Sequence, residues 1–589
     1  MNRILYIPIV LFLIIAQIKS QNNLPIPPLD TGTWNNEVRT FDLLMSNSST
    51  EFLPGIQTPT SGYNGSYLGP TLLMHKGDNV ALNVTNQLGE NSTTHWHGFH
   101  VPAIMDGGPH QMIPHNTTWT ATFEMLNQAS TFWYHPHHKP TFWSDSDGTG
   151  GQVHRGLAAM IIVEDEVTDG LDIPKTYGVD DIPLIIQDRA FNPDGTFREF
   201  INLPALVVRT GDTMLVNGAI TPTHNAPAQM IRYRILNASN GRSYYLGFSD
   251  NRDFYQIGSD GGLLESPIAL NRLRISPAER VEIVVDFSND LNSTIDLLSY
   301  ASEFINIFPT YPPPLRDAMD TTDYRIMGFS VIDATSDPIT TLPSTLTDIP
   351  LYNENDAVNN TSPRPFVIVN GAPLATINGA SMDLNVINET IQLGNLEVWE
   401  ITNLSGVAHP FHIHGAPFQV LSRSNGPVPE NEKGWKDVIL VPAAQGMNNP
   451  GVVKVIKPFL DFADDTFPYM YHCHILEHED RGMMGQYVVI DTVTTSIGEM
   501  NEIISDSRLY PNPVDANTVQ VEFLTTVADE FTFSLVSGTG QIIQTFFENK
   551  QVGTGKHIYT LNLEGIPSGM YFISIKSKQG SVVKKLIRI

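Results

Sequence analysis

Four pairs of histidines, each pair separated by a single residue, carry the clearest chemistry in this 589-residue sequence. Alternate side chains of a β-strand point to the same face, so each pair presents two imidazoles on one side of an extended segment. One such pair is also typical of a solvated strand face, but four pairs, two early and two late, indicate metal ligation. The pairs are His95 and His97, His135 and His137, His412 and His414, and His472 and His474.

The single cysteine of the chain, Cys473, lies between the two histidines of the last pair. If this segment is extended, the thiol faces away from both histidines and needs partners of its own. His478 and Met483 follow the cysteine, and His409 precedes the third pair. One Cys, two His and a weak axial Met form the ligand set of a blue-copper centre, whereas zinc has no use for a thioether. The sequence therefore predicts a blue copper at Cys473.

These two groups of ligands together predict a redox reaction. The chain makes Cys473 covalently continuous with His472 and His474, so an electron can pass from the blue copper to metals on the opposite face. The eight paired histidines suffice for a three-copper cluster with open positions for O2. We expect a reducing substrate to give up one electron at a time at the blue copper. The cluster would then reduce O2 to water with four electrons.

Other motifs along the chain resemble the multicopper oxidase family. The similar segments cover nearly all of residues 21–491, and they include residues 69–71, 215–218, 234–239 and 276–280. The resemblance implies an all-β fold with three cupredoxin-like Greek-key β-sandwich domains. It also implies that a trinuclear copper cluster lies between the first and third domains.

The resemblance further implies four copper ions per chain, one of type 1, one of type 2 and two of type 3. The sequence keeps every ligand position of the family pattern. By this pattern the type 1 copper is bound by His409, Cys473, His478 and Met483, the type 2 copper by His95 and His412, and the type 3 pair by His97, His135, His137, His414, His472 and His474.

Three carboxylates match functional positions of the family. Asp106 and Glu479 match acids that relay protons to oxygen in bacterial copper-efflux-type oxidases, and O2 reduction consumes protons. If they do not relay protons, Asp106 is a turn acid before two glycines and Glu479 is a solvated acid at a strand end. Asp437 matches a position near the blue-copper histidine that faces substrate, and its alternative is a turn acid. The other histidines are interpreted as structural or surface groups, namely His75, His100, His110, His115, His138, His154, His224 and His557.

Strands must position these ligands, because short alternating runs such as 80–84, 282–286 and 398–401 recur between Gly, Pro, Asn and Asp. The last 80 or so residues hold similar runs at 519–523, 531–535 and 571–575, which predict a small β-sandwich. We interpret the chain as a signal peptide at 1–20, cupredoxin domains at 21–166, 167–343 and 344–491, a linker at 492–507 and a C-terminal domain at 508–589.

Both ends of the chain predict export. Arg3 precedes an apolar run at 4–16, which is too short to span a bilayer but typical of a signal peptide. No later stretch is apolar enough to cross a membrane. The C-terminal segment resembles the type IX secretion sorting domain of gliding bacteria, which implies the secretion machinery as a partner. We expect a monomer that passes through the periplasm to the cell surface or medium. Its net charge of −28 argues against nucleic acid as a partner.

Three functions stay open at this stage. The leading hypothesis is a laccase-like oxidase of phenols, aromatic amines or similar reductants. The second is a cuprous (metallo-) oxidase for copper tolerance, which the scattered methionines disfavour because no dense run precedes His409. The third is a non-enzymatic copper-binding surface protein, which would have had no reason to keep all twelve ligands. The axial Met483 is expected to lower the blue-copper potential, which predicts easily oxidised substrates.

Overall fold

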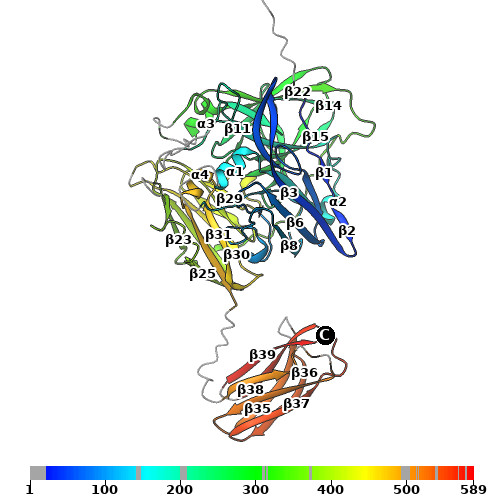
Figure 1. Ribbon diagram of the computed structural model, residues 1–589, viewed down its shortest axis with the longest axis vertical. Coiled ribbons are helices and arrows are strands. Elements are labelled where there is room, and N and C mark those ends of the chain that lie inside the picture. The colour runs from blue at the N-terminus through cyan, green and yellow to red at the C-terminus, as the bar shows by residue number, and fades with distance from the viewer. Residues whose placement is uncertain are drawn as a thin grey trace, which may run out of the picture. The chain divides into compact units, whose positions relative to one another are not determined.

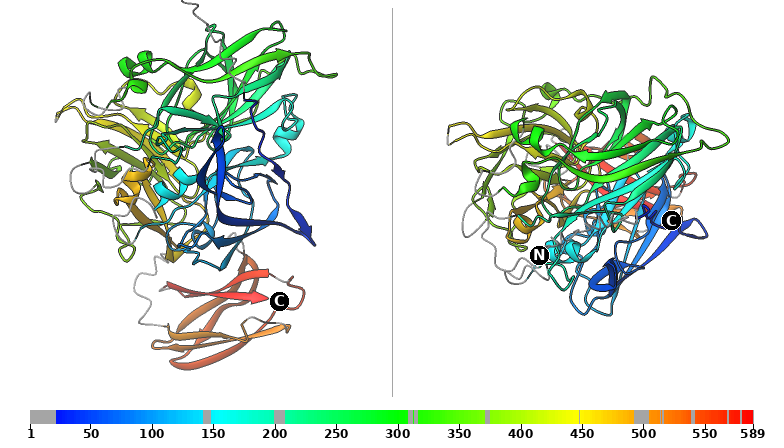
Figure 2. Two further views of the ribbon diagram at one scale, coloured as in Figure 1. Left: turned by 45° about the horizontal axis from the view of Figure 1, so that its top comes forward. Right: turned by 90° about the horizontal axis from the view of Figure 1, so that it is seen from above.

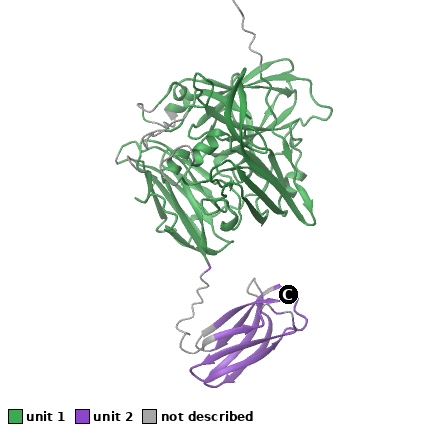
Figure 3. Ribbon diagram, in the orientation of Figure 1, with its two compact units in different colours: residues 1–490 green, residues 491–589 purple. Residues whose placement is uncertain are grey.

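The computed structural model of the protein describes residues 22–140, 148–198, 208–307, 312, 316–370, 375–446, 448–491, 504–512, 514, 516–537, 542–567, 569–577 and 580–588. The chain divides into two compact units, residues 1–490 and 491–589 (Figure 3). The signal peptide predicted at 1–20 and most of the linker predicted at 492–507 lie outside the described residues.

The first part of unit 1 is a sandwich of two five-stranded sheets. Its strands are β1 (Leu29–Asp30), β2 (Thr33–Asn35), β3 (Val38–Leu53), β4 (Ile56–Tyr63), β5 (Thr71–His75), β6 (Asn79–Gln87), β7 (His95–His97), β8 (Thr118–Glu124), β9 (Ser130–His135) and β10 (Ala159–Glu164). One sheet has the order β1-β5-β10-β9-β7, and the other has β2-β3-β6-β8 with β4 paired to β3. Leu82 of β6 and Ile161 of β10 share the core between them. The first two histidine pairs lie on the edge strand β7 and at the end of its neighbour β9.

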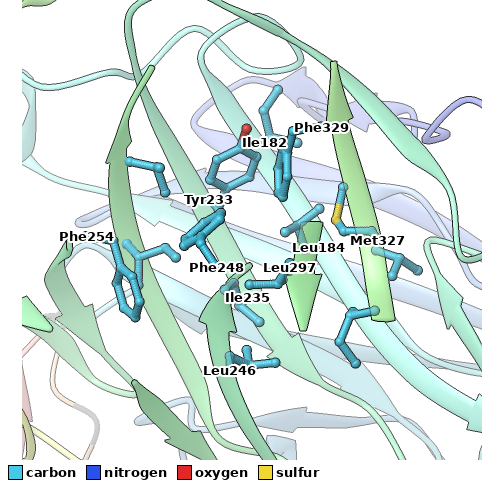
Figure 4. Close-up of a cluster of buried hydrophobic side chains, with 14 of the residues drawn as sticks. Ile182, Leu184, Tyr233, Ile235, Leu246, Phe248, Phe254, Leu297, Met327 and Phe329 are labelled. Carbon is cyan, nitrogen blue, oxygen red and sulfur yellow. The ribbon is translucent and has the colours of Figure 1, made fainter. Parts of the chain in front are cut away.

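A larger sandwich follows and has seven strands in one sheet and five in the other. Its strands are β11 (Asp181–Arg189), β12 (Thr213–Val216), β13 (Ala219–Ile220), β14 (Thr223–Pro227), β15 (Met230–Asn237), β16 (Tyr244–Phe248), β17 (Phe254–Ser259), β18 (Gly262–Leu270), β19 (Leu273–Ile275), β20 (Arg280–Asp286), β21 (Thr294–Ser299) and β22 (Tyr324–Ile332). The sheet orders are β13-β12-β11-β15-β20-β17-β18 and β14-β22-β21-β16-β19. Tyr233, Phe248 and Phe329 meet in the core between the two sheets (Figure 4).

The predicted strand at 282–286 lies within β20, but the expected alternation of buried and exposed residues is wrong there. All residues of β20 except the last are buried. The second face of this strand packs against β9 of the first sandwich, where the Thr131 hydroxyl donates to Glu282 Oε1 at 2.7 Å. Because both faces are covered by protein, the sheet has no solvent side at this point.

The third sandwich of unit 1 holds the remaining histidine pairs. Its strands are β23 (Arg364–Asn370), β24 (Ala375–Ile377), β25 (Glu389–Gln392), β26 (Leu396–Asn403), β27 (His409–Ile413), β28 (Gln419–Arg423), β29 (Val438–Val441), β30 (Gly451–Pro458), β31 (Asp464–Cys473) and β32 (Met484–Ile490). The sheet orders are β24-β23-β26-β30-β28 and β25-β32-β31-β27-β29. Phe366 and Tyr471 pack face to edge in the core between the sheets. Figures 1 and 2 show the three sandwiches of unit 1 in blue, green and yellow.

Short helices connect the sheets of unit 1. They are α1 (Thr149–Arg155), α2 (Glu166–Gly170), α3 (Ala301–Ile307) and α4 (Leu476–Asp480), with 3-10 turns η1 (Ala103–Met105), η3 (Ala318–Asp320), η4 (Glu354–Asp356) and η5 (Glu430–Glu432). α1 and α4 lie side by side (Figure 1). The Asp480 carboxylate accepts hydrogen bonds from the backbone N–H groups of Thr149 and Gly150, both at 2.9 Å. Among the described residues, every helix is too short or too polar to span a membrane.

Unit 2 is a separate small sandwich. Its strands are β33 (Ile504–Tyr510), β34 (Thr518–Thr525), β35 (Asp529–Ser537), β36 (Ile542–Val552), β37 (Gly555–Asn562), β38 (Gly569–Ser577) and β39 (Gly580–Arg588). A three-stranded sheet, β33-β34-β37, faces a four-stranded sheet, β36-β35-β38-β39. Phe523 and Phe533 belong to the core between them. The all-β fold and the strands expected in this segment are confirmed.

Candidate metal centre

The histidine pairs expected on strands lie mostly at strand ends. Only His95 and His97 belong to a single strand throughout, β7. The other pairs begin on β9, β27 and β31, and their second member follows at or beyond the strand end. The two rings of each pair still lie together, with centroids 4.7 Å apart for His412 and His414. All twelve predicted ligand residues are buried.

Backbone carbonyl groups orient His95 and His412. Nδ1 of His95 lies 2.7 Å from the carbonyl oxygen of Asp106, and Nδ1 of His412 lies 2.7 Å from that of Asp437. A carbonyl oxygen only accepts, so both Nδ1 atoms carry the hydrogen and both Nε2 atoms carry a lone pair. Neither Nε2 atom has a hydrogen-bond partner among the described residues. Such a pair of inward lone pairs fits a cation.

Two further Nε2 atoms converge on that of His472. Nε2 of His472 lies 3.1 Å from Nε2 of His137 and 3.2 Å from Nε2 of His414. His414 donates through Nδ1 to Asp106 Oδ2 at 2.6 Å, and His472 donates through Nδ1 to the carbonyl of Cys473 at 3.0 Å. With Asp106 ionised, the facing Nε2 atoms of His414 and His472 therefore both carry lone pairs. Two lone pairs at this distance repel each other unless a cation lies between them, so the donor set again fits a metal.

In His97 the roles of the two ring nitrogens are exchanged. Its Nε2 donates to Asp437 Oδ1 at 3.2 Å, which leaves the lone pair on Nδ1. That Nδ1 lies 3.4 Å from Nε2 of His135, whose own Nδ1 donates to the carbonyl of Pro136 at 2.7 Å. The ring of His474 lies 5.0 Å from the ring of His97. Ligand atoms of His97, His135 and His474 all lie within 4.8 Å of one another.

Burial keeps these imidazoles in the neutral form that metals bind. Burial lowers the pKa of His95 to about 3. Burial first, and then the neighbouring histidines, lower the pKa well below its ordinary value for the other members of the group whose shift is resolved. These are His97, His135, His137, His412, His414 and His474.

Cys473 forms a second group with His409 and His478. Its Sγ lies 3.3 Å from Nδ1 of His409 and 3.7 Å from Nδ1 of His478. The backbone N–H of Cys473 donates to the carbonyl of Met483 at 3.1 Å, which brings the predicted axial residue beside the cysteine. Burial raises the pKa of the Cys473 thiol, so a thiolate here requires a neighbouring cation. The donor set of one sulfur and two imidazoles fits copper.

Ser405 orients His409. Its hydroxyl donates to Asn403 Oδ1 at 2.8 Å, and its oxygen lies 2.8 Å from Nε2 of His409. The oxygen therefore accepts from Nε2, and the lone pair of His409 is directed at the sulfur. Ser405 could not be predicted, since a serine four residues before a histidine carries no signal of its own.

The two predicted proton-relay acids both lie against the histidine cluster. Asp106 is buried with Oδ2 on His414, and burial raises its pKa well above the ordinary value. Glu479 is buried too, with Oε2 3.2 Å from Nδ1 of His472 and Oε1 3.4 Å from Nδ1 of His137. The alternative of a solvated strand-end acid is wrong for Glu479, because it belongs to α4. Asp106 does precede the turn at Gly107, but its carboxylate faces the cluster.

Asp437 lies elsewhere than predicted. It is buried and contacts His97, whereas it was expected near the blue-copper histidine and facing substrate. The cause is the register of β29 on β27, in which Val438 pairs with His412 and Val441 pairs with His409. Asp437 precedes Val438, so it lies at the His412 end of the strand pair.

No sequence pattern indicated several residues that the structure suggests as functional candidates. Arg280 contacts Asp437, and Lys457 is buried with no hydrogen-bond partner for Nζ among the described residues. Three methionines that are far apart in the sequence pack together. They are Met382, Met470 and Met484. None of the eight histidines interpreted as structural or surface groups joins the groups of metal-ligand atoms found among the described residues.

Comparison with known proteins agrees with this geometry. Two multicopper oxidase family models match residues 45–168 and 354–493, and a secretion system C-terminal sorting domain matches residues 508–589. The multicopper oxidase mco of Staphylococcus haemolyticus is 36% identical over 470 residues, which cover 77% of this chain and 89% of the relative. The cell division protein FtsP of Escherichia coli is 34% identical over 483 residues, with coverage of 80% and 93%.

A solved structure supports the same assignment. It is the bacterial laccase-like multicopper oxidase CueO from the lignin-degrading bacterium Ochrobactrum sp., with 33% identity and a TM-score of 0.69. The match covers 79% of this chain and all of that chain. The fold, the convergent histidines and these relatives lead to one conclusion, which is that the chain belongs to the multicopper oxidase family.

Proposed function

We propose that the protein is an exported oxidase that couples one-electron oxidation of a phenolic, aromatic amine or similar reductant to four-electron reduction of O2 to water. One observation carries this proposal. The Nε2 atoms of His95, His412 and His472 carry lone pairs, because the Nδ1 atom of each ring donates to a backbone carbonyl, and His414 joins them when Asp106 is ionised. A decayed fold would have no reason to preserve this arrangement.

The ligand roles follow the family pattern. We assign His409, Cys473, His478 and Met483 to a type 1 copper, and His95 and His412 to a type 2 copper. Four bound coppers would supply one-electron redox chemistry and a place for O2 to bind. The type 3 pair would be held by His97, His135, His137, His414, His472 and His474.

The protein itself contributes a path for electrons and a supply of protons. Cys473 lies between the two histidines His472 and His474, so the peptide chain links the sulfur group to the histidine cluster. Four one-electron oxidations balance the conversion of one O2 and four protons into two water molecules. A proton carried by Asp106 or Glu479 lies next to the cluster, because each carboxylate contacts a cluster histidine. Burial excludes bulk water from both carboxylates.

Oxidation of cuprous ions is a second candidate, favoured by the buried methionines. Met470 lies two residues before His472 on β31, and Met484 of β32 pairs directly with His472. Both side chains therefore share the face of His472, and Met382 packs against them. Thioethers are soft ligands that suit Cu(I). The methionines are scattered in the sequence, but these three are gathered in space.

One experiment separates the candidate functions. The purified protein is reconstituted with copper, its copper content is measured, and O2 uptake is followed with phenols, aromatic amines and Cu(I). The proposal expects four coppers per chain, a blue absorption lost in Cys473→Ser, and faster O2 uptake with phenols or amines than with Cu(I). The reverse order of rates would favour the cuprous oxidase. A colourless protein without O2 uptake would instead indicate a non-enzymatic role.

We also propose that the protein reaches the cell surface or medium, with unit 2 as the sorting signal. The family match at residues 508–589 supports this. Deleting these residues should retain the protein inside the cell envelope, which fractionation and immunoblotting would detect. Equal amounts of full-length and shortened chain in the medium would contradict it.

A further inference from the structure

The middle sandwich supplies none of the assigned copper ligands, yet one of its side chains lies directly behind them. We propose that Arg280 of β20 is a positioning residue that fixes Asp437 and thereby sets which ring nitrogen of His97 faces the cluster. The inference rests on the proposed function, because the effect of Arg280 is exerted on copper ligands. It assigns to the middle sandwich a part in building the trinuclear site.

The contact between Arg280 and Asp437 is a two-point ion pair. Nη1 donates to Oδ1 and Nη2 donates to Oδ2, both at 2.6 Å, and neither side chain is more than 1% exposed. Two parallel charge-assisted hydrogen bonds fix the plane of the carboxylate as well as its position. Oδ1 of this carboxylate also accepts the Nε2 hydrogen of His97. Arg280 therefore acts on His97 through one intermediate residue.

Asp437 orients a second assigned ligand at the same time. Its carbonyl oxygen accepts from Nδ1 of His412, while its side chain accepts from His97. The rings of His97 and His412 are stacked, with centroids 3.8 Å apart. One residue thus aligns a histidine of the first sandwich with a histidine of the third. Displacing Asp437 would disturb both.

The guanidinium group of Arg280 has an acceptor for each of its five hydrogens. Besides the two bonds to Asp437, Nε donates to the carbonyl of Thr131 at 3.0 Å, Nη1 to the carbonyl of Ala278 at 3.2 Å and Nη2 to that of Asp260 at 2.7 Å. Thr131 belongs to β9, which ends at a cluster histidine. Arg280 therefore contacts all three sandwiches at one point. Lysine has only three donors and no fixed plane, so it cannot reproduce this set.

The backbone beside His97 leaves no room for another arrangement. Gly98 has φ +89°, and a Cβ atom there would lie 2.4 Å from Asp437 Oδ2 and 2.7 Å from Arg280 Nη2. The ion pair is therefore packed directly against the main chain that follows the ligand. A shift of the carboxylate is transmitted to His97 because Oδ1 is hydrogen-bonded to its ring.

Arg280→Gln tests the inference, with Arg234→Gln as the matched control. Arg234 lies on the neighbouring strand β15 and is equally buried, but it bonds Asp181 and Glu282 and does not contact Asp437. Both variants lose a buried arginine of the same sheet. Only Arg280→Gln releases the carboxylate behind His97.

The readouts are copper content, the blue absorption and the electron paramagnetic resonance signal of the type 2 copper. For Arg280→Gln we expect an intact blue absorption, fewer than four coppers per chain or an altered type 2 signal, and turnover lower by about 10–100-fold. Arg280→Lys should restore charge without the two-point geometry and recover only part of the loss. Arg234→Gln should keep four coppers and the parent signal.

Three results would overturn the inference. The first is an Arg280→Gln protein with four coppers and an unchanged type 2 signal, and the second is an Arg234→Gln protein with the same copper loss. If Arg280→Gln does not fold, Arg280→Lys and Asp437→Asn take its place, and parent-like signals in both are the third. A parent protein that binds no copper would instead refute the proposed function.

Discussion

At the level of single residues, the central feature of this site is which ring nitrogen of each histidine carries the hydrogen. Carbonyl oxygens set the hydrogen position on His95 and His412, whereas carboxylates set it on His97 and His414. A carbonyl cannot take up a proton at ordinary pH, but a carboxylate can. The Asp106 contact therefore combines orientation with the capacity to store a proton, whereas Asp437 is held in an ion pair by Arg280.

Glu479→Gln tests proton transfer at the other buried acid beside the histidine cluster. Gln keeps the size and shape of the side chain but cannot carry a proton, so turnover should fall by about 100-fold while the blue absorption is kept. Glu477→Gln is the control, because Glu477 lies on the same helix α4 and bonds Asn240 in place of a cluster histidine. Unchanged turnover in Glu479→Gln, measured by O2 uptake, would remove this carboxylate from the mechanism.

Lys457 predicts a pH dependence of stability. Burial lowers its pKa to about 7 from an ordinary value of 10.5. Between these pH values the unfolded chain binds a proton that the folded chain lacks, so this group makes the free energy of unfolding rise with pH across the window. Lys457→Met removes the cost of burial and should stabilise the protein by about 2–4 kcal/mol at pH 7. The gain should shrink toward pH 10.

Chemical unfolding at a series of pH values measures this effect. Lys454→Met is the control, because Lys454 lies on the same strand β30 but is partly exposed beside Glu354 and Glu400. It should show no comparable gain. A Lys457→Met protein whose stability follows pH in parallel with the parent would contradict the expectation.

At the scale of elements, the site is built at the ends of strands. β27 and β31 are hydrogen-bonded neighbours, with His412 opposite His472, and each continues into a turn that carries the next ligand. α4 follows β31. It places His478 in the group that contains the cysteine, and it places Glu479 against the histidine cluster. Its position depends on Asp480, which binds the first backbone N–H groups of α1.

Asp480→Ala should loosen α4. The buried backbone N–H of Gly150 would lose its acceptor, which costs about 1–3 kcal/mol, whereas that of Thr149 keeps the carbonyl of His138 at 3.1 Å. Because His478 lies in the same helix, the blue absorption should weaken as well. Asp480→Asn keeps one acceptor oxygen and should retain more of both. Equal stability and colour in the parent and Asp480→Ala, measured by denaturant unfolding and absorption, would contradict this role.

Local patterns in the sequence were enough to single out the histidines and the cysteine that cluster in the structure, but not their surroundings. Cys473 and its neighbouring histidines lie close together in the chain, so type and spacing were informative. The position of Asp437 depends on the register between β27 and β29, which short motifs do not encode. Lys457 is unexpected because its strand presents it on the core face beside Val455 and Phe459. The domain boundaries inside unit 1 and the reducing substrate stay predictions.

In the whole molecule, the assigned copper site and the proposed sorting signal lie in different units. Unit 1 contains all twelve assigned ligands, and unit 2 has its own core around Phe523 and Phe533. The two units therefore have independent sources of stability. Nothing in the assigned copper chemistry requires a residue from unit 2.

Truncation after residue 491 should leave the oxidase intact. We expect the shortened protein to bind copper and consume O2 at the parent rate, because its three cores are complete. Differential scanning calorimetry of the full chain should show one transition that disappears on truncation and another that does not. A shortened protein that is unfolded or free of copper would show that unit 2 supports the fold of unit 1.

The joining of distant segments also sets an order of events during biosynthesis. His414 and Asp106 are in contact although 308 positions separate them, and His137 and His472 are separated by 335. A chain made from its N-terminus carries the first four histidines of the cluster long before the last four have been synthesised. The cluster is complete only after β31 has docked, so we expect loading with copper to be a late step of maturation. A nascent chain with half the cluster histidines offers metal ions an incomplete site, so we expect copper to bind weakly until the chain is complete.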